Sequence, residues 1–158
     1  GVLDSLAPRL TNDAVLLLPA VQAYQTLGQT NQTRQNLAVL IPLLDRILAD
    51  PTADDMRLQV ALQGFQMIGN VPRLEATLQR LLKNNPASPE LWYDLGALFA
   101  YQAKTNAAVT AVSNAILHSN ARLKQKPTEQ NLQTMAATDP RFSTLQNLPE
   151  FKQLVAPK

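Results

Sequence analysis

The sequence contains no cysteine, one histidine and only five glycines in 158 residues. Without cysteine the chain can form no disulfide, has no thiolate nucleophile and cannot ligate a metal through sulfur. Because His118 is the single histidine, the chain cannot offer a pair of imidazole ligands to zinc. A Gly-rich phosphate loop, a G-x-S-x-G elbow and an H-E-x-x-H motif are also absent. We therefore expect a protein that is not an enzyme and that has no cofactor and no metal.

Charge of either sign is scarce and nearly balanced. The 14 basic and 12 acidic residues give a formal net charge of +2, and charged residues make up 16% of the chain. This weak excess argues against nucleic acid or an anionic membrane as the partner, although the sequence pI is about 9.1. Asp54 and Asp55 invite a metal interpretation. However, adjacent helical side chains point apart, and a helix start accounts for the pair better.

Long apolar runs are also absent. The longest, 14–18 and 37–44, are short and are interrupted by Pro19 or Pro42, whereas a bilayer span needs roughly 20 apolar residues. We expect no membrane insertion of this segment. Because the chain begins with Gly1 rather than Met, we expect a fragment of a longer polypeptide, in which a signal or anchor could lie upstream. The compartment, cytoplasmic or extracytoplasmic, stays open.

Apolar residues recur at helical spacing in segments that end at Gly, Asn or Pro. Capping side chains at 11–13 precede a first helix that ends at Gly28. Pro19 should kink or restart this helix, and Pro42 should bend the next one. A polar turn is expected at 30–33. Further helices are expected over 35–49, 54–69, 71–83, 89–103 and from about 106 to 123.

Two pairs of these helices superpose at an offset of 34 residues, the distance from Leu58 to Trp92. A period of this length, with two helical segments and a break between them, is typical of helix–turn–helix repeats stacked into a solenoid. The superposed patterns are Leu58-x-x-Ala61-Leu62-x-x-Phe65 with Leu74-x-x-x-Leu78-x-x-Leu81, and Trp92-x-x-Leu95-Gly96-x-x-Phe99 with Ala108-x-x-x-Val112-x-x-Ala115.

The second of these patterns resembles a tetratricopeptide repeat, because Trp92, Leu95, Gly96 and Phe99 match the W-x-x-L-G-x-x-Y helix of that family. The resemblance covers roughly 13–121. It implies an all-α fold, in which about three antiparallel helix pairs form a right-handed superhelical stack that is followed by C-terminal capping helices. Small residues at Gly96 and Ala108 would allow the two helices to approach closely, and Trp92 would pack inside, between helices.

We expect a single domain over 1–158. Its parts are a degenerate first pair at 11–50, a second pair at 54–86, a third pair at 88–123 and a C-terminal cap at 127–158. The first pair is about two turns longer than the others, and Leu62 departs from the small residue usual at its position in the second pair. The cap should start with a short helix from Pro127 and continue as a hydrophobic lid that carries Phe142, Leu145 and Phe151.

In this family the first helix of each pair lines a concave groove. Glutamine amides donate and accept hydrogen bonds and could bind a peptide backbone, and tyrosines offer a large contact area. The positions that should face the groove carry no Lys or Arg, which argues against the clamp that binds a chaperone's C-terminal carboxylate. The other interpretation is an ordinary solvated helix face. The expected groove residues are Gln22, Gln25, Gln59, Gln63, Gln66, Tyr93, Ala97 and Tyr101.

The resemblance implies a non-catalytic protein–protein interaction module. It would bind a peptide or a partner domain of unknown identity in this groove, as part of a larger bacterial protein. The alternative is a structural or oligomerisation domain, with no ligand of its own, that braces a neighbouring catalytic or membrane domain. Single-stranded RNA binding, as in related helical repeats, needs a basic groove, and this one is neutral.

Overall fold

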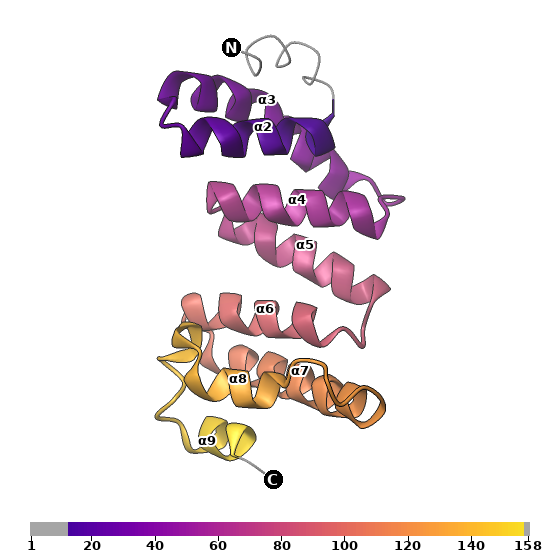
Figure 1. The fold of residues 1–158 in the computed structure, drawn as a ribbon, viewed down its shortest axis with the longest axis vertical. Coiled ribbons are helices and arrows are strands. Elements are labelled where there is room, and N and C mark those ends of the chain that lie inside the picture. Colours follow the sequence, from indigo (N-terminus) through magenta and orange to yellow (C-terminus); the bar gives the residue numbers. More distant parts are fainter. Residues whose placement is uncertain (1–12, 157–158) are drawn as a thin grey trace. The chain divides into compact units, whose positions relative to one another are not determined.

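The computed structural model describes residues 13–156, without the side chain of Leu16, and this part of the chain consists of helices and turns with no strand (Figure 1). The expected all-α fold class is confirmed. Residues 11 and 12 of the expected first cap, and both ends of the expected domain, lie outside the described residues. The helices are α2 (Ala14–Thr26), α3 (Thr30–Ala49), α4 (Asp55–Ile68), α5 (Val71–Asn84), α6 (Pro89–Tyr101), α7 (Thr105–Gln125), α8 (Leu132–Thr138), the 3-10 helix η1 (Pro140–Phe142) and α9 (Pro149–Val155).

Side-chain caps and glycines set the helix ends where the sequence indicates them. The Asp13 carboxylate accepts the Val15 N–H at 2.8 Å, and the Asp54 carboxylate accepts the Arg57 N–H at 2.8 Å. Ser88 caps α6, with Pro89 at its first position. Gly28 and Gly69 follow α2 and α4 with φ of 67° and 74°, a left-handed conformation that glycine adopts without strain.

The start of α3 differs from the expectation. The segment 30–33 is not a separate turn but the first turn of α3. Polar side chains bond within this turn: the Thr33 hydroxyl donates to the Gln29 carbonyl at 3.0 Å, and the Asn36 amide donates to the Gln32 carbonyl at 2.8 Å. Both bonds run to the carbonyl four residues earlier, so these polar side chains are satisfied inside the helix rather than in a separate turn.

Two other expectations are corrected. The first helix does not restart at Pro19: α2 continues through Pro19, as α3 does through Pro42, and both prolines lie on the exposed side of their helix, where the carbonyl that loses its N–H partner can bind water. The short helix expected from Pro127 begins only at Leu132, because Asn131 caps it by accepting the N–H groups of Gln133 and Thr134 at 3.0 and 3.2 Å.

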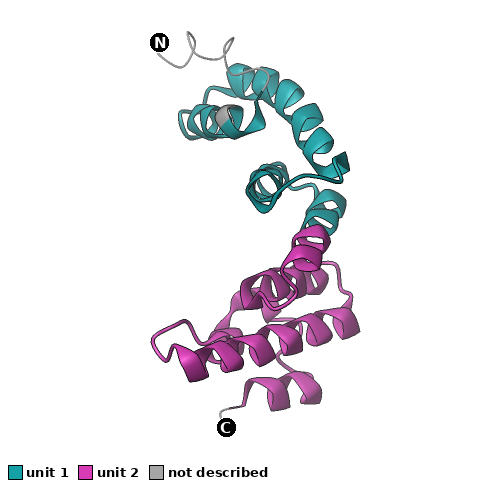
Figure 2. Ribbon diagram, turned by 90° about the vertical axis from the view of Figure 1, so that its right-hand side faces the viewer, with its two compact units in different colours: residues 1–77 teal, residues 78–158 magenta. Residues whose placement is uncertain are grey.

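The chain divides into two compact units, residues 1–77 and 78–158, and the boundary falls within α5 (Figure 2). In unit 1, α2 pairs with α3, and α4 packs against both. Tyr24, Leu44 and Phe65 are among the side chains buried there. Helix α4 meets α3 at Gly64, where an added Cβ would overlap the end of the Leu44 side chain but no backbone atom of α3. Within unit 1, α4 therefore stacks on the preceding helix pair.

Arg73, in the first turn of α5, joins three helices of unit 1. Its guanidinium binds the Asp45 carboxylate of α3 through two contacts, at 2.8 and 2.5 Å. It also lies 5.8 Å from the centre of the Phe65 ring on α4. A bidentate pair fixes the direction of both side chains better than a single contact does.

In unit 2, α6 and α7 pack along their length. The small residues act as the repeat pattern indicates: a Cβ on Gly96 would lie 2.7 Å from the Val112 Cγ2 and 3.5 Å from the Ala108 carbonyl oxygen. Ala108 and Val112 are both fully buried. Glycine at position 96 is therefore what allows the two helices to approach this closely.

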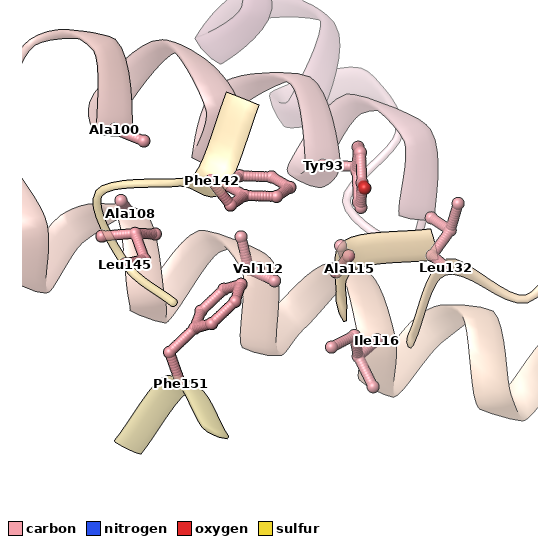
Figure 3. Close-up of a cluster of buried hydrophobic side chains, with 11 residues drawn as sticks. Tyr93, Ala100, Ala108, Val112, Ala115, Ile116, Leu132, Phe142, Leu145 and Phe151 are labelled. Carbon is pink, nitrogen blue, oxygen red and sulfur yellow. The ribbon is translucent and has the colours of Figure 1, made fainter. Parts of the chain in front are cut away.

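The C-terminal segment completes the core of unit 2 (Figure 3). Helix α8 packs on α7, α9 contacts α7 and α8, and η1 contacts α6. Phe142 is fully buried, with its ring 5.1 Å from that of Tyr93 and 5.8 Å from that of Phe151. Phe142, Leu145 and Phe151, which were expected in a hydrophobic lid, are buried together with residues of α6 and α7.

None of the helices in the described part of the chain combines the length and the apolar content that a bilayer span requires.

Candidate functional site

The expected groove residues fall into two sets, one in each unit. In unit 1 all five glutamines are exposed, and in unit 2 only Tyr101, at 79% exposure, points fully into solvent. We call the unit 1 set the amide face. It consists of Gln22 and Gln25 on α2 and of Gln59, Gln63 and Gln66 on α4.

The amide face lies on two helices that contact each other, α2 and α4. On α4 its three residues stand at i, i+4 and i+7, which places them in one stripe along the helix. Leu58, which is fully buried, lies on a different face of the helix. None of the five side-chain amides forms a hydrogen bond within residues 13–156. Their donors and acceptors are free for a ligand or for water.

The surroundings of the amide face carry little charge. Helix α2 has no charged residue, and the charged residues of α4, Asp55 and Arg57, both lie in its first turn. The Arg57 guanidinium is paired with the Asp50 carboxylate at 2.8 Å. Met56 and Leu27, at 66% and 62% exposure, add accessible apolar surface on or next to the same helices. This surface can recognise a ligand by hydrogen bonds and apolar contacts rather than by charge.

Tyr93 does not line an open groove, so the prediction for this residue is wrong. Only 2% of it is exposed, and its hydroxyl donates to the Asp139 carboxylate at 2.9 Å. Phe142 packs edge-on against its ring. Ala97 is half-buried and packs against the same core. The cause is the C-terminal segment, which returns to cover this side of α6.

Trp92 agrees with its expected position only in part. It packs against the unit 2 core but is half-buried rather than enclosed. Its indole N–H donates to the Pro86 carbonyl at 2.8 Å. A buried indole needs a partner for this N–H, and here the loop before α6 supplies it.

Asp139 and Arg141 form a charged cluster with α6 that the sequence did not reveal. Arg141 donates to Asp139 through Nη2 at 2.8 Å and Nε at 3.1 Å, reaches Asp94 at 3.3 Å and lies 5.2 Å over the Tyr93 ring. The sequence shows Asp139-Pro140-Arg141-Phe142 in this order, but it does not show that this segment contacts α6. The cluster fastens the C-terminal segment to α6.

The cluster shifts the acidity of its members. Hydrogen bonds from Arg141 lower the pKa of the Asp139 carboxyl. Burial raises the pKa of the Tyr93 hydroxyl, and its hydrogen bond to Asp139 raises it further. Loss of surrounding water raises the pKa of Asp94, although half of its side chain is exposed, and the charge of Arg141 opposes this shift.

The free energy of unfolding should fall in acid partly through Asp139. Because its pKa is lower in the folded chain than the ordinary value of about 3.9, its contribution is complete above that pH and is lost as the pH falls through the folded pKa. We expect Asp139→Asn to be less stable than the parent near neutral pH and this difference to shrink in acid. Urea unfolding at a series of pH values measures it.

Asp94→Asn is the matched control, since the pKa of Asp94 is shifted the other way. Protonation of Asp94 removes an unfavourable charge from the folded parent protein. The free energy of unfolding of the parent should therefore rise relative to that of Asp94→Asn as the pH falls. A stability difference of Asp139→Asn that stays constant with pH would contradict the assignment.

Within residues 13–156, no three His, Cys, Asp or Glu side chains lie close enough together to hold a metal ion. Comparison of the chain with family models, with curated proteins and with solved structures finds no match in any of the three. The tetratricopeptide resemblance therefore rests on the repeat pattern itself and stays a prediction.

Proposed function

We propose that this chain is a non-catalytic protein-interaction module whose amide face binds an extended peptide segment of a partner protein. The observation that carries the proposal is the set of five exposed glutamines on the adjacent helices α2 and α4, whose amides have no partner within the described residues. Each amide both donates and accepts hydrogen bonds, as do the backbone groups of an extended chain.

The dimensions of the amide face suit such a ligand. Gln59 and Gln66 are seven residues apart on α4, which corresponds to about 10 Å along the helix axis. About three residues of extended chain cover the same length. The three amides of α4 can therefore contact successive peptide groups, and Gln22 and Gln25 on α2 add a second row of contacts.

The proposal includes the repeat family: helix pairs of the tetratricopeptide type, arranged as a right-handed superhelical stack. The stacking of α4 on α2 and α3 supports it within unit 1. The close packing of α6 on α7 at Gly96 supports it within unit 2. Tyr101, exposed at the end of α6, is a further candidate contact for the partner.

Peptides selected from a random display library by binding to this protein should lose affinity when the amide face is changed. A neutral hydrogen bond contributes about 1 kcal/mol, so the double variant Gln59→Ala with Gln63→Ala should bind about thirtyfold more weakly. Isothermal calorimetry measures the affinity. It should depend little on salt, because few charges on this face can be screened.

Gln35→Ala is the matched control, because Gln35 is an exposed glutamine of the same unit but lies on α3. The affinity of the Gln35→Ala variant for the selected peptides should equal that of the parent. Equal losses in the control and the double variant, or no loss in either, would contradict the amide face. Selection of no peptide, combined with concentration-dependent self-association in sedimentation, would instead fit the oligomerisation or bracing role.

A further inference from the structure

A depression of about 660 Å³ opens on unit 2, between the last turns of α7, helix α8 and the end of α9. Its residues all lie between 120 and 155, so it is distinct from the amide face of unit 1. The volume falls within the range of roughly 300–1,000 Å³ that is usual for small-molecule sites.

Gln133 on α8 holds the walls of this depression together. It is 8% exposed, its side-chain oxygen accepts from the Asn120 amide of α7 at 3.1 Å, and its amide nitrogen donates to the carbonyls of Leu154 and Ala156 at 3.2 and 2.6 Å. One buried amide thus links α7, α8 and the end of α9. The shape of the depression is therefore set before any ligand binds.

Apart from the Asn120 side-chain oxygen, the polar side-chain groups left free in the depression carry donors. The Asn131 side-chain oxygen is occupied by the N–H groups of Gln133 and Thr134, which leaves the Asn131 side-chain N–H groups available. The Lys124 ammonium and the Thr134 hydroxyl have no partner within the described part of the chain. No Asp or Glu is among the described residues that line the depression. A site rich in donors, with one positive charge, favours an anionic acceptor.

The other walls are apolar. They come from Leu123 on α7, Ala137 on α8 and Val155 on α9. A simple inorganic anion would leave these walls in contact with water. An anion that carries an aliphatic chain would cover them and gain the free energy of apolar burial.

We propose that this depression binds an aliphatic carboxylate. The carboxylate would lie against the Lys124 ammonium and the Asn131 amide, and the aliphatic chain against Leu123, Ala137 and Val155. Two sources share this chemistry: a free aliphatic acid, and the C-terminus of a peptide that ends in an aliphatic residue. The site is independent of the peptide binding proposed for unit 1.

Titration of the whole chain with hexanoate, followed by amide proton–nitrogen spectra, tests the site. Saturable shifts are expected at 120–137 and near Val155. Lys124→Gln should weaken binding about fivefold, the effect of removing a partly exposed ion pair. Lys126→Gln is the matched control, because Lys126 is an exposed lysine two residues away that does not line the depression. Equal weakening in both lysine variants would show that hexanoate is attracted only by the positive charge of this region, and it would overturn the proposal.

Ala137→Leu tests the cavity without a change of charge. Ala137 is exposed on α8, and leucine is a good helix former, so the fold should be retained, as thermal unfolding can verify. The larger side chain should occupy the space of the ligand's aliphatic chain beside position 137 and weaken the binding of hexanoate, with correspondingly smaller shifts at the same concentration. A peptide with a free C-terminal valine, compared with its amidated form, identifies the source of the carboxylate. Absence of saturable binding by hexanoate and by the free-acid peptide in the millimolar range would overturn the site.

Discussion

Phe142→Ala is expected to destabilise unit 2 by about 3–5 kcal/mol, the usual cost of truncating a buried aromatic side chain. Phe142 is fully buried, and its ring contacts those of Tyr93 and Phe151. The truncation would leave a cavity where the C-terminal segment meets α6. Urea unfolding, followed by the fluorescence of Trp92, the single tryptophan of the chain and a neighbour of this core, measures the change.

Leu117→Ala provides the matched control for this truncation. Leu117 lies on α7 in the same unit, but 63% of it is exposed. Its replacement should change the free energy of unfolding by no more than about 0.5 kcal/mol. If Phe142→Ala were as mild as Leu117→Ala, the C-terminal segment could not be part of the unit 2 core.

Gly96→Ala is expected to destabilise the protein by about 1–2 kcal/mol, although alanine is the better helix former. The added Cβ would lie 2.7 Å from the Val112 Cγ2 and 3.3 Å from the Val112 backbone nitrogen. Neither atom moves easily, because valine is stiff at χ1 and the nitrogen belongs to α7. Because an overlap at 2.7 Å is severe, the cost of overpacking should lie in the upper part of its usual range of about 1–3 kcal/mol and exceed the gain in helix propensity of about 1 kcal/mol. Thermal unfolding measures the loss.

Gly64→Ala in unit 1 is the control that separates the cost of overpacking from the gain in helix propensity. The added Cβ would meet the end of the Leu44 side chain, which can rotate away. The propensity gain should then offset most of the strain, and we expect a net change of no more than about 0.5 kcal/mol. Equal losses at Gly64 and Gly96 would show that the contact with the α7 backbone is not what makes Gly96 necessary.

The helix ends were predictable where a single side chain or glycine decides them. Asp54, Ser88 and Gly69 act within one turn of their own position, so the sequence pattern was enough. The start of α3 was not predictable from composition, because Thr33 and Asn36 bond to carbonyls of their own helix instead of forming a turn. Both conformations use the same residues, and only the packed structure selects between them.

The candidate site divides in the same way. Exposure of the glutamines follows from the helical period of the buried residues, Val21 and Tyr24 on α2 and Leu58 and Phe65 on α4, and was predicted. The period of α6 by itself placed Tyr93 in an open groove, and the structure buries it beneath Phe142. The depression at Gln133 was not predictable, because its walls come from three helices. The helical period orders residues within one helix and does not show how the three helices meet.

The sequence by itself determined that this chain is helical, where most of its helices begin and end, and that α6 and α7 pack closely at Gly96. These features depend on contacts within a turn or between neighbouring helices. Only the tertiary structure decided that the C-terminal segment encloses Tyr93 and that Gln133 links α7, α8 and α9. These contacts join residues far apart in the chain, and their geometry depends on the shape of the whole core rather than on local propensity.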